Sequence, residues 1–525
     1  MSPLREGVEE MRKLYMITGL VFGLGLLVHS GASAEAMGHA RLSLIQGEGI
    51  LQTPDTGTDW GAASINTPLV PEMKLWLPEG GKAEVQFVGG SYLRADEGTE
   101  VDVMNLKIDS QSNISQVGLP RGRTYIYYPG SSAGDAVFQV DTPLASAKAY
   151  GASKFMVDVY EDGYTEVSAI SGLVYVESQS GNTTVEAGNM LSLGSAQTAE
   201  VSPMRQADAW VAWNQSRDSV FAQTGPSRRH LPPALAIFGS DLDSHGRWVY
   251  SVDLGYVWTP LRVGVEWAPY RVGKWCWIGG DYVWVSYDSW GWVPYHYGRW
   301  SYAANVGWCW IPPAMNAFYW GPGYVAWIGT SSFVSWVPLA PGEIYYGRGY
   351  YGPFSVNTAN INIHTIKGTN FYLNAYVGNG VTVVGRETFL TGRPERLVNA
   401  PANPFREGFR PAIGRPDIKP VRATALPVPT RIVSEWMLPP KEVTQRAARV
   451  EHRPTAANRD VSVFRPGQRV ASMPTRRVEH PPKAVIQRAH PGSAHRELGQ
   501  SPAFNSRTAK PSNQGGKHIR PPLQK

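Results

Sequence analysis

Polar and apolar residues alternate along short stretches of the first 200 residues, and Gly and Pro separate these stretches. In one stretch the apolar residues fall on one side and the polar residues on the other: Ala83, Val85 and Phe87 against Glu84 and Gln86. A period of two residues predicts a β-strand with one side in a core and one side in water.

The same alternation occupies residues 155–159 and 165–169, and Asp162-Gly163 between them predicts a tight hairpin turn. Further short strands follow at even spacing. The pattern therefore predicts an all-β domain over residues 40–214, built as a β-sandwich or a β-roll. A short helix at residues 207–213 closes it, with Trp210 and Trp213 on one face. Residues 215–240 contain Gly225-Pro226, Arg228-Arg229 and Pro232-Pro233, which predicts a linker.

A second pattern begins near residue 241. The phrase Gly-Arg/Lys-Trp occurs at residues 246–248, 273–275 and 298–300, so the spacing between copies is 27 and then 25 residues. About ten residues after each copy lies a second aromatic group that ends in Trp. Two aromatic-rich strands around a Gly-containing turn predict a β-hairpin, and a fixed period predicts that the hairpins repeat and pack together over residues 241–345.

This repeat region contains 14 of the 19 Trp residues, from Trp248 to Trp336. Two interpretations are open. The rings form an aromatic core whose N–H groups bond to loop carbonyls, or some rings remain exposed and stack on a glycan or a protein. The candidates for an exposed ligand-binding surface are Trp258, Trp284, Trp290, Trp292 and Trp310. The Arg or Lys of each repeat is expected to lie over a neighbouring ring.

After an Asn-rich connector and one last strand in residues 346–400, the composition changes. Residues 401–525 contain 19 Pro and carry 23 Lys and Arg against 8 Asp and Glu, a net charge of +15 within a chain total of +6. Such a composition predicts a disordered basic tail. Two interpretations are open: the tail binds anionic polymers, or it is a solvated linker without a partner. Nucleic acid is not expected, because the tail lacks interleaved aromatic residues.

The N-terminus has the pattern of a signal peptide in residues 1–34. Arg12 and Lys13 precede an apolar run of 14 residues, and Ala32-Ser33-Ala34 follows as a cleavage site. The run is short for a membrane span, although an uncleaved anchor is an alternative. The expected location is the periplasm or the cell surface, with no transmembrane span in the mature chain.

Cys276 and Cys309 are the two cysteines, and both lie within repeats. Export permits a disulfide between them. The alternative is a pair of buried free thiols, because unpaired Cys residues are commonly buried.

Residues 138–147, 151–159, 172–174 and 185–188 resemble the FecR domain, the periplasmic β domain of iron-dicitrate-type transmembrane sensors. The resemblance covers residues 40–200 and implies the fold and partner binding. Two departures are Tyr150-Gly151-Ala152, in place of the family's Arg-Gly-Thr, and the lack of a cytoplasmic anti-sigma segment before the apolar run. Residues 241–343 resemble an exported bacterial family with repeated Gly-Arg-Trp and Trp-x-Pro phrases, whose function is not established.

Motifs of catalysis do not emerge. Residues 130–134 match G-x-S-x-G in letters, but no helix follows to form a nucleophile elbow, and no metal or cofactor motif is present. The leading hypothesis is an exported envelope binding or scaffold protein that is not an enzyme and uses no cofactor or metal. The alternative is a FecR-like signal-sensing component of an envelope regulatory system.

Overall fold

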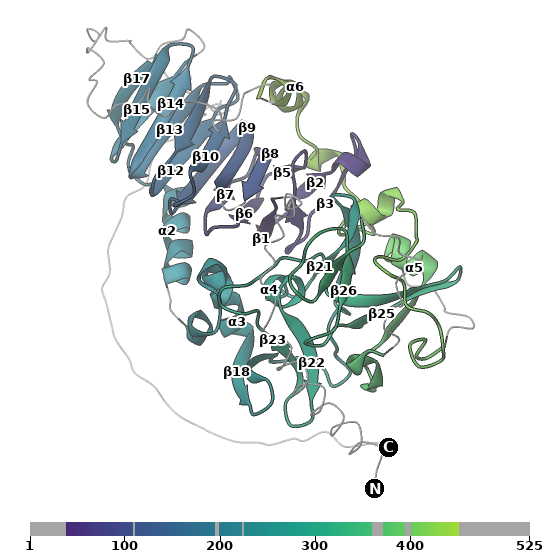
Figure 1. The fold of residues 1–525 in the computed structure, drawn as a ribbon. Coiled ribbons are helices and arrows are strands. Elements are labelled where there is room, and N and C mark those ends of the chain that lie inside the picture. The colour runs from purple at the N-terminus through teal and green to yellow at the C-terminus, as the bar shows by residue number, and fades with distance from the viewer. Residues whose placement is uncertain are drawn as a thin grey trace, which may run out of the picture. The chain divides into compact units, whose positions relative to one another are not determined.

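The computed structural model describes residues 38–108, 111–194, 199–222, 225–359, 371–393 and 401–450. The predicted signal peptide lies outside these residues. Strands dominate the described chain (Figure 1), which confirms the all-β class. None of the helices in the described ranges is long and apolar enough to cross a membrane.

The first domain contains 17 strands that join through one long strand, β9. Their bounds are β1 Ala40–Gln46, β2 Ile50–Gln52, β3 Trp60–Ala62, β4 Pro68–Leu69, β5 Lys74–Leu77, β6 Lys82–Phe87, β7 Tyr92–Ala95, β8 Thr99–Ile108, β9 Ser112–Tyr128, β10 Asp135–Asp141, β11 Ala145–Ala149, β12 Ser153–Val159, β13 Thr165–Ser171, β14 Leu173–Ser178, β15 Gly181–Glu186, β16 Asn189–Leu193 and β17 Ala199–Pro203. A single 3₁₀ turn, η1 Pro54–Thr56, follows β2.

These strands form two sheets that share β9. Sheet A has the order β3-β2-β5-β8-β9-β10-β11-β14-β15, and sheet B has the order β4-β1-β6-β7-β9-β12-β13-β16-β17. All pairs are antiparallel except β9 with β10. The first part of β9 pairs in sheet A and the last part in sheet B, so the chain passes between sheets near Gly122, whose φ is 108°.

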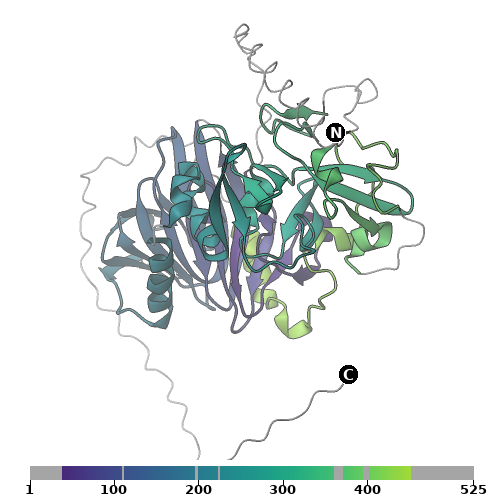
Figure 2. The same ribbon diagram turned by 90° about the horizontal axis from the view of Figure 1, so that it is seen from below.

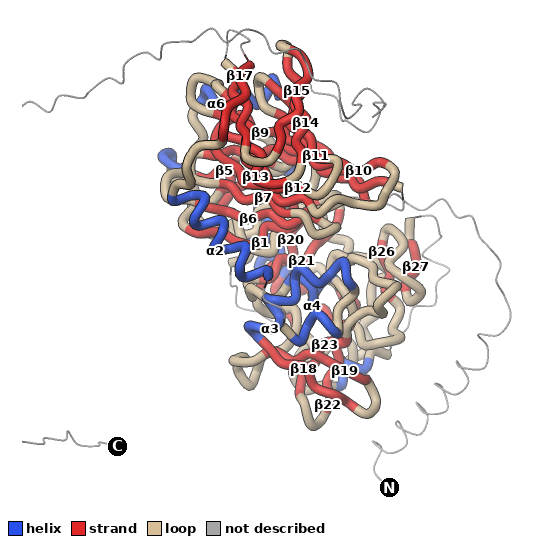
Figure 3. Tube along the Cα trace, turned by 90° about the vertical axis from the view of Figure 1, so that its left-hand side faces the viewer, coloured by secondary structure: helices blue, strands red, loops and turns tan. Residues whose placement is uncertain are grey.

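Apolar residues of both sheets fill one core between them. Ala83, Val85 and Phe87 face this core, as the alternation predicts, and Asp162-Gly163 forms the turn between β12 and β13. The polar positions Glu84 and Gln86 differ from the expectation. They are buried as well, because helix α2, Ala209–Ala222, covers the other face of sheet B (Figure 3).

Helix α2 continues well past the residues predicted to be helical, and the expected linker at residues 215–240 is structured. After α2 come two 3₁₀ turns, η2 Pro226–Arg229 and η3 Pro233–Phe238, and then helix α3, Gly239–His245. Pro starts each turn. Leu231, Leu235 and Phe238 are buried in the core of the second domain, which is why these residues are part of the fold.

The second domain, here called the aromatic domain, begins at α3. Its further elements are β18 Gly246–Ser251, β19 Gly255–Pro260, β20 Gly273–Ile278, β21 Asp281–Ser286, α4 Trp292–His296, β22 Arg299–Ala303, β23 Gly307–Ile311, β24 Val325–Gly329, β25 Phe333–Pro338, β26 Tyr345–Gly347, β27 Ser355–Asn357, η5 Leu373–Tyr376, β28 Thr382–Gly385 and α5 Arg386–Thr391. The sheets are β18-β19-β23-β22, β20-β21, β24-β25-β28 and β26-β27. Strand β28 lies where the last strand is predicted.

Four antiparallel hairpins carry the aromatic domain, and each places two Trp residues directly opposite one another. The pairs are Trp248–Trp258, Trp275–Trp284, Trp300–Trp310 and Trp327–Trp336. Directly opposite residues lie on the same face of the hairpin. The first three hairpins are the predicted repeats. The fourth lacks the Gly-Arg/Lys-Trp phrase, so the repeat pattern does not reveal it.

Sterics explain why each repeat begins with glycine. A Cβ on Gly246 would overlap the indole of Trp258. A Cβ on Gly273 would overlap the backbone oxygen of Val285 and come 2.6 Å from Cζ2 of Trp284, and a Cβ on Gly298 would overlap the backbone oxygen of Ile311 and come 2.8 Å from Nε1 of Trp310. In each hairpin the second Trp therefore lies over the backbone of the opening glycine.

Hairpin β20–β21 belongs to both cores. Cys276, Ile278, Val283 and Val285 on one face pack with the core of the first domain, and Trp275, Tyr282 and Trp284 on the other face pack in the aromatic core. Because side chains alternate between the faces of a strand, one hairpin joins the two domains.

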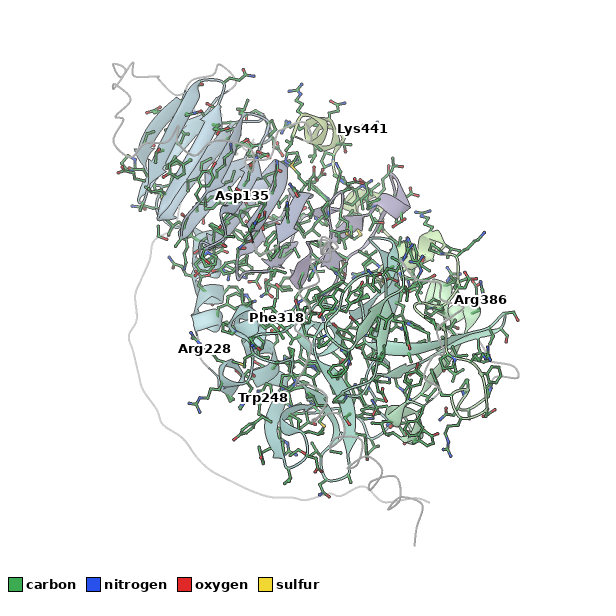
Figure 4. All side chains as sticks on the ribbon, in the orientation of Figure 1. Asp135, Arg228, Trp248, Phe318, Arg386 and Lys441 are labelled. Carbon is green, nitrogen blue, oxygen red and sulfur yellow. The ribbon has the colours of Figure 1, made fainter. Side chains whose placement is uncertain are left out.

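The expected start of a disordered tail at residue 401 is wrong, because residues 401–450 pack on the fold. They contain η6 Arg422–Ala425, η7 Glu435–Met437 and helix α6 Lys441–Val450, which starts at Lys441 in Figure 4. This segment lies beside the first strands (Figure 2). Ile418, Met437 and Val443 are buried. Before α6, single apolar residues without periodicity fill grooves that other elements build, and the composition conceals this packing. In α6 the buried residues Val443, Ala447 and Val450 do follow the helical period.

We predict that Gly298→Ala destabilises the protein more than Gly307→Ala. Both residues have positive φ, 69° and 84°, so either substitution introduces backbone strain of about 1–2 kcal/mol. At Gly307 a Cβ meets nothing within 4 Å, whereas at Gly298 it overlaps the backbone oxygen of Ile311 and the ring of Trp310, which adds about 1–3 kcal/mol. Urea unfolding of the full chain measures the difference. Equal midpoints would show that these two contacts are not what requires glycine at residue 298.

Candidate functional site

The predicted exposed aromatic surface is wrong, because all five candidate rings are buried. Trp258 and Trp310 are 0% exposed, and Trp284, Trp290 and Trp292 are 1%, 5% and 2% exposed. The four hairpins close around one another, and η3, α3 and α5 cover them, so the rings pack together in one cluster. The alternative interpretation, an aromatic core, is the one that the structure has.

Several indole N–H groups bond to backbone carbonyls, as that interpretation requires. Trp258 donates to the oxygen of Leu242 at 3.1 Å, and Trp310 donates to the oxygen of Tyr297 at 2.7 Å. Trp290 packs against Trp258, and Trp292 packs against His296. Of the repeat cations, Arg299 lies over the ring of Tyr324, 3.9 Å from its centre, whereas the Lys274 ammonium bonds to backbone oxygens.

Cys276 and Cys309 are both buried free thiols, so the disulfide alternative is not formed. They lie in different sheets: Cys276 on β20 faces the core of the first domain, and the Cys309 thiol on β23 contacts the oxygen of Ser301. Burial raises the pKa of both thiols, that of Cys309 to about 11.

A pocket of about 770 Å³ lies beside α2, on the face of sheet B that points away from the core. Strands β9, β12, β13 and β16 form its floor, and α2 with the chain that precedes it forms a wall. Its polar residues alternate with the core residues of the same strands. The charged ones are Arg123, Lys154, Asp158, Glu166, Arg205, Asp208 and Asp218, and Met156, Met190 and Met204 supply apolar surface.

A buried ion network fixes α2 to the sheet next to this pocket. Arg94, which is fully buried, bonds through Nε to Glu84 at 2.8 Å and through Nη1 to Asp218 of α2 at 2.7 Å. Asp218 also accepts from Lys154 at 2.7 Å and from Tyr92 at 2.6 Å. Although burial opposes it, these hydrogen bonds and the charge of Arg94 hold the pKa of Asp218 below its ordinary value.

Asp158 differs from the other carboxylates of the pocket. It is 9% exposed, and its Oδ2 accepts from Nε of Arg123 at 3.3 Å, but its Oδ1 has no hydrogen-bond partner among the described residues. Glu166, by contrast, accepts from Tyr160 and Arg205, and Asp208 accepts from Arg123. Burial raises the pKa of Asp158 to about 6, with Arg123 opposing and Glu166 adding to the rise.

Two family models match the chain. Residues 73–175 match the family described as FecR protein, and residues 239–343 match DUF6600, a family of unknown function. The chain carries a FecR domain followed by a DUF6600 domain. The two resemblances drawn from the sequence are thereby confirmed.

Among solved structures, the chain is similar to a candidate anti-sigma factor of Parabacteroides distasonis. The structure of that protein at 1.65 Å resolution is 19% identical with a TM-score of 0.24, and the match covers 27% of this chain and 64% of that chain. The structure at 2.50 Å resolution has the same identity and TM-score, and the match covers 28% of this chain and 71% of that one. No curated protein matches the chain.

The pocket beside α2 extends beyond the matched part of the FecR domain. Arg123, Lys154, Asp158 and Glu166 lie within residues 73–175, whereas Met190, Met204, Asp208 and α2 lie between the two matched regions. The sequence shows the charged positions as the polar side of strands. It does not show that a helix would turn this side into a pocket.

We predict that neither thiol reacts with an aromatic disulfide reagent in the folded protein and that both react after denaturation without a reductant. Burial and the raised pKa values of Cys276 and Cys309 keep the thiols protonated and covered. Thiol titration counts the reactive groups. Zero reactive thiols after denaturation would instead demonstrate a disulfide.

We predict that Asp158→Asn stabilises the protein at pH 7 and has little effect near pH 3.5. The pKa of Asp158 is about 6 in the folded protein and 3.8 ordinarily, so the folded state binds its proton more tightly and ionisation lowers stability as pH rises between these values. The gain at pH 7 is at most about 3 kcal/mol. Urea unfolding of both forms across this pH range measures it. A difference in unfolding free energy between the two proteins that grows toward low pH would contradict the raised pKa of Asp158.

Proposed function

We propose that this protein is an exported, signal-sensing component of the bacterial cell envelope, and that its FecR domain binds a partner protein in the pocket beside α2. The match to the FecR family supports the regulatory role. The pocket supplies charged and apolar contacts on a rigid sheet, and the proposal requires binding without catalysis.

The unpartnered Oδ1 of Asp158 carries the proposal. A buried carboxylate oxygen without a donor is unfavourable, and a cationic group from a partner would satisfy it. The methionine side chains of the pocket offer apolar surface to the stem of such a group. The matching ligand is a Lys or Arg side chain that a partner protein presents, because both carry a cation on an apolar stem.

The basic end of the chain adds a second contact in this proposal. Residues 451–525 carry 14 Lys and Arg against 4 Asp and Glu, a net charge of +10. Such a charge favours anionic polymers of the envelope. The buried Trp core gives no support to a glycan-binding aromatic surface, which is not part of the proposal.

A second candidate function, an envelope scaffold without signalling, is favoured by the hairpin β20–β21 that the two domains share. A hairpin buried in both cores holds the two domains in one fixed arrangement, and a scaffold protein needs such rigidity. The two functions differ in whether loss of the protein changes gene expression.

We predict that a photo-crosslinking amino acid at Gln206, an exposed residue of the pocket wall, captures a partner protein in cells of the native host. In the Asp158→Asn background the yield should fall about tenfold, as expected for a loss of 1.4 kcal/mol. The matched control carries the same amino acid at Val252, which is 89% exposed in the DUF6600 domain and should not capture that partner.

The gene expression readout separates the two functions. Deletion of the gene should change a defined set of transcripts, and Asp158→Asn should reproduce the change at normal protein level. Unchanged transcripts after deletion would favour the scaffold. A crosslink that does not depend on Asp158 would remove the pocket from the proposal. Mass spectrometry that finds a mature N-terminus at Glu35 would support export by a cleaved signal peptide and would count against the signal-sensing function.

A further inference from the structure

A second cavity, of about 810 Å³, lies in the aromatic domain, and part of its lining follows the matched residues 239–343. Hairpin β20–β21, strand β28, helix α5 and residues 428–430 contribute to its lining. Aromatic rings form much of the wall: Trp275, Trp284, Trp336 and Phe389. Cavities of this size with mainly apolar walls and a few polar groups are typical of sites for small organic molecules.

Two of these rings have hydrogen-bond donors that the fold does not use. Trp275 and Trp284 are 2% and 1% exposed, and the described structure gives neither Nε1 an acceptor. Trp336, in the same lining, donates to the oxygen of Tyr270 at 3.0 Å. Three other Trp residues of the second domain, outside this lining, also leave Nε1 without an acceptor in the described structure, so these two donors do not by themselves mark a ligand.

The charge of the lining points to an anion as the ligand. Lys274 is 7% exposed, and its Nζ reaches the oxygen of Ala423 at 3.0 Å and that of Trp275 at 3.4 Å. Arg271 is the second cation of the lining. No Asp or Glu occurs among the described residues that line the cavity. A buried ammonium ordinarily has a counter-ion, and here the fold supplies only carbonyl oxygens.

We propose that this cavity binds an organic anion, a carboxylate attached to an aromatic or other flat apolar body. The carboxylate accepts from Lys274, and the apolar body lies against the rings of Trp336 and Phe389. A neutral sugar fits less well, because its hydroxyl donors would find no carboxylate or amide side chain in the lining. This site is separate from the pocket beside α2 and does not rest on its proposed function.

The full-length protein can be titrated by calorimetry with 4-phenylbutyrate and with 4-phenylbutyramide, its neutral amide of nearly the same shape. We expect saturable binding of the carboxylate and binding at least about tenfold weaker for the amide, which corresponds to 1.4 kcal/mol. Glucose should not bind. Equal affinity for carboxylate and amide, or no binding of the carboxylate up to millimolar concentration, would overturn the proposal.

Two variants locate the site. Lys274→Met keeps the apolar stem and removes the charge, so it should weaken 4-phenylbutyrate at least about tenfold and leave the amide unchanged. Lys419→Met is the matched control, because Lys419 is exposed and does not line the cavity. Thermal unfolding shows whether each variant folds. If Lys274→Met does not fold, the comparison of carboxylate and amide binding in the unaltered protein still tests the proposal. If Lys274→Met folds and binds 4-phenylbutyrate with unchanged affinity, Lys274 is not the residue that binds the carboxylate.

Discussion

The DUF6600 domain depends on one close contact, an indole ring over a glycine. In three successive hairpins the second Trp lies over the opening glycine, Gly246, Gly273 or Gly298. Any Cβ at these positions would meet the ring, and at Gly273 and Gly298 it would also meet a backbone oxygen of the opposite strand. The contact fixes the direction of the ring, and these rings meet Trp residues of other hairpins: the centres of Trp284 and Trp336 are 6.4 Å apart, and those of Trp310 and Trp248 are 6.1 Å apart.

This constraint also explains why so many Trp residues form a core instead of a surface. Each buried aromatic side chain removes about 150–250 Å² from water, which at about 25 cal/mol per Å² contributes several kcal/mol. A linear stack of thin hairpins could not cover that many rings. The hairpins close around one another instead, and segments from residues 226–245 and 386–391 complete the cover.

Hairpin β20–β21 links the two domains because its side chains alternate between its two faces. One face presents small and aliphatic residues to the FecR domain, and the other presents aromatic rings to the DUF6600 domain. Polar contacts support the joint. Arg41, 1% exposed, bonds to Asn66 at 3.0 Å and pairs with Asp241 at 2.8 Å, and Asn66 donates to the oxygen of Asp288 at 2.7 Å. These buried groups satisfy one another only when both domains are folded, so the domains are expected to unfold together.

The sequence predicts the strands well. It predicts less well which helices and loops pack on them. Alternation identifies β6, β12 and β13, and the repeated phrase identifies three of the four hairpins. The same patterns do not show that α2 covers the polar face of sheet B, which makes Glu84 buried and turns Asp158 into a pocket residue. Whether a helix packs on a given sheet face depends on contacts between residues far apart in the sequence. Neither the hydrophobic periodicity of the strands nor the amino-acid composition predicts such contacts. Aromatic abundance likewise does not distinguish a core from a surface.

Residues 401–450 are the clearest case of packing that the sequence does not reveal, because their composition resembles that of a disordered chain. Leu426 fits against Gly61, where any side chain would exclude it, and Val428 and Pro429 form part of the wall of the aromatic cavity. The oxygen of Ala423 accepts from Lys274. This segment therefore supplies both a wall of the cavity and a partner of its buried cation. Occupancy of the cavity and docking of the segment stabilise one another, since a ligand that binds the closed cavity favours the docked state by mass action.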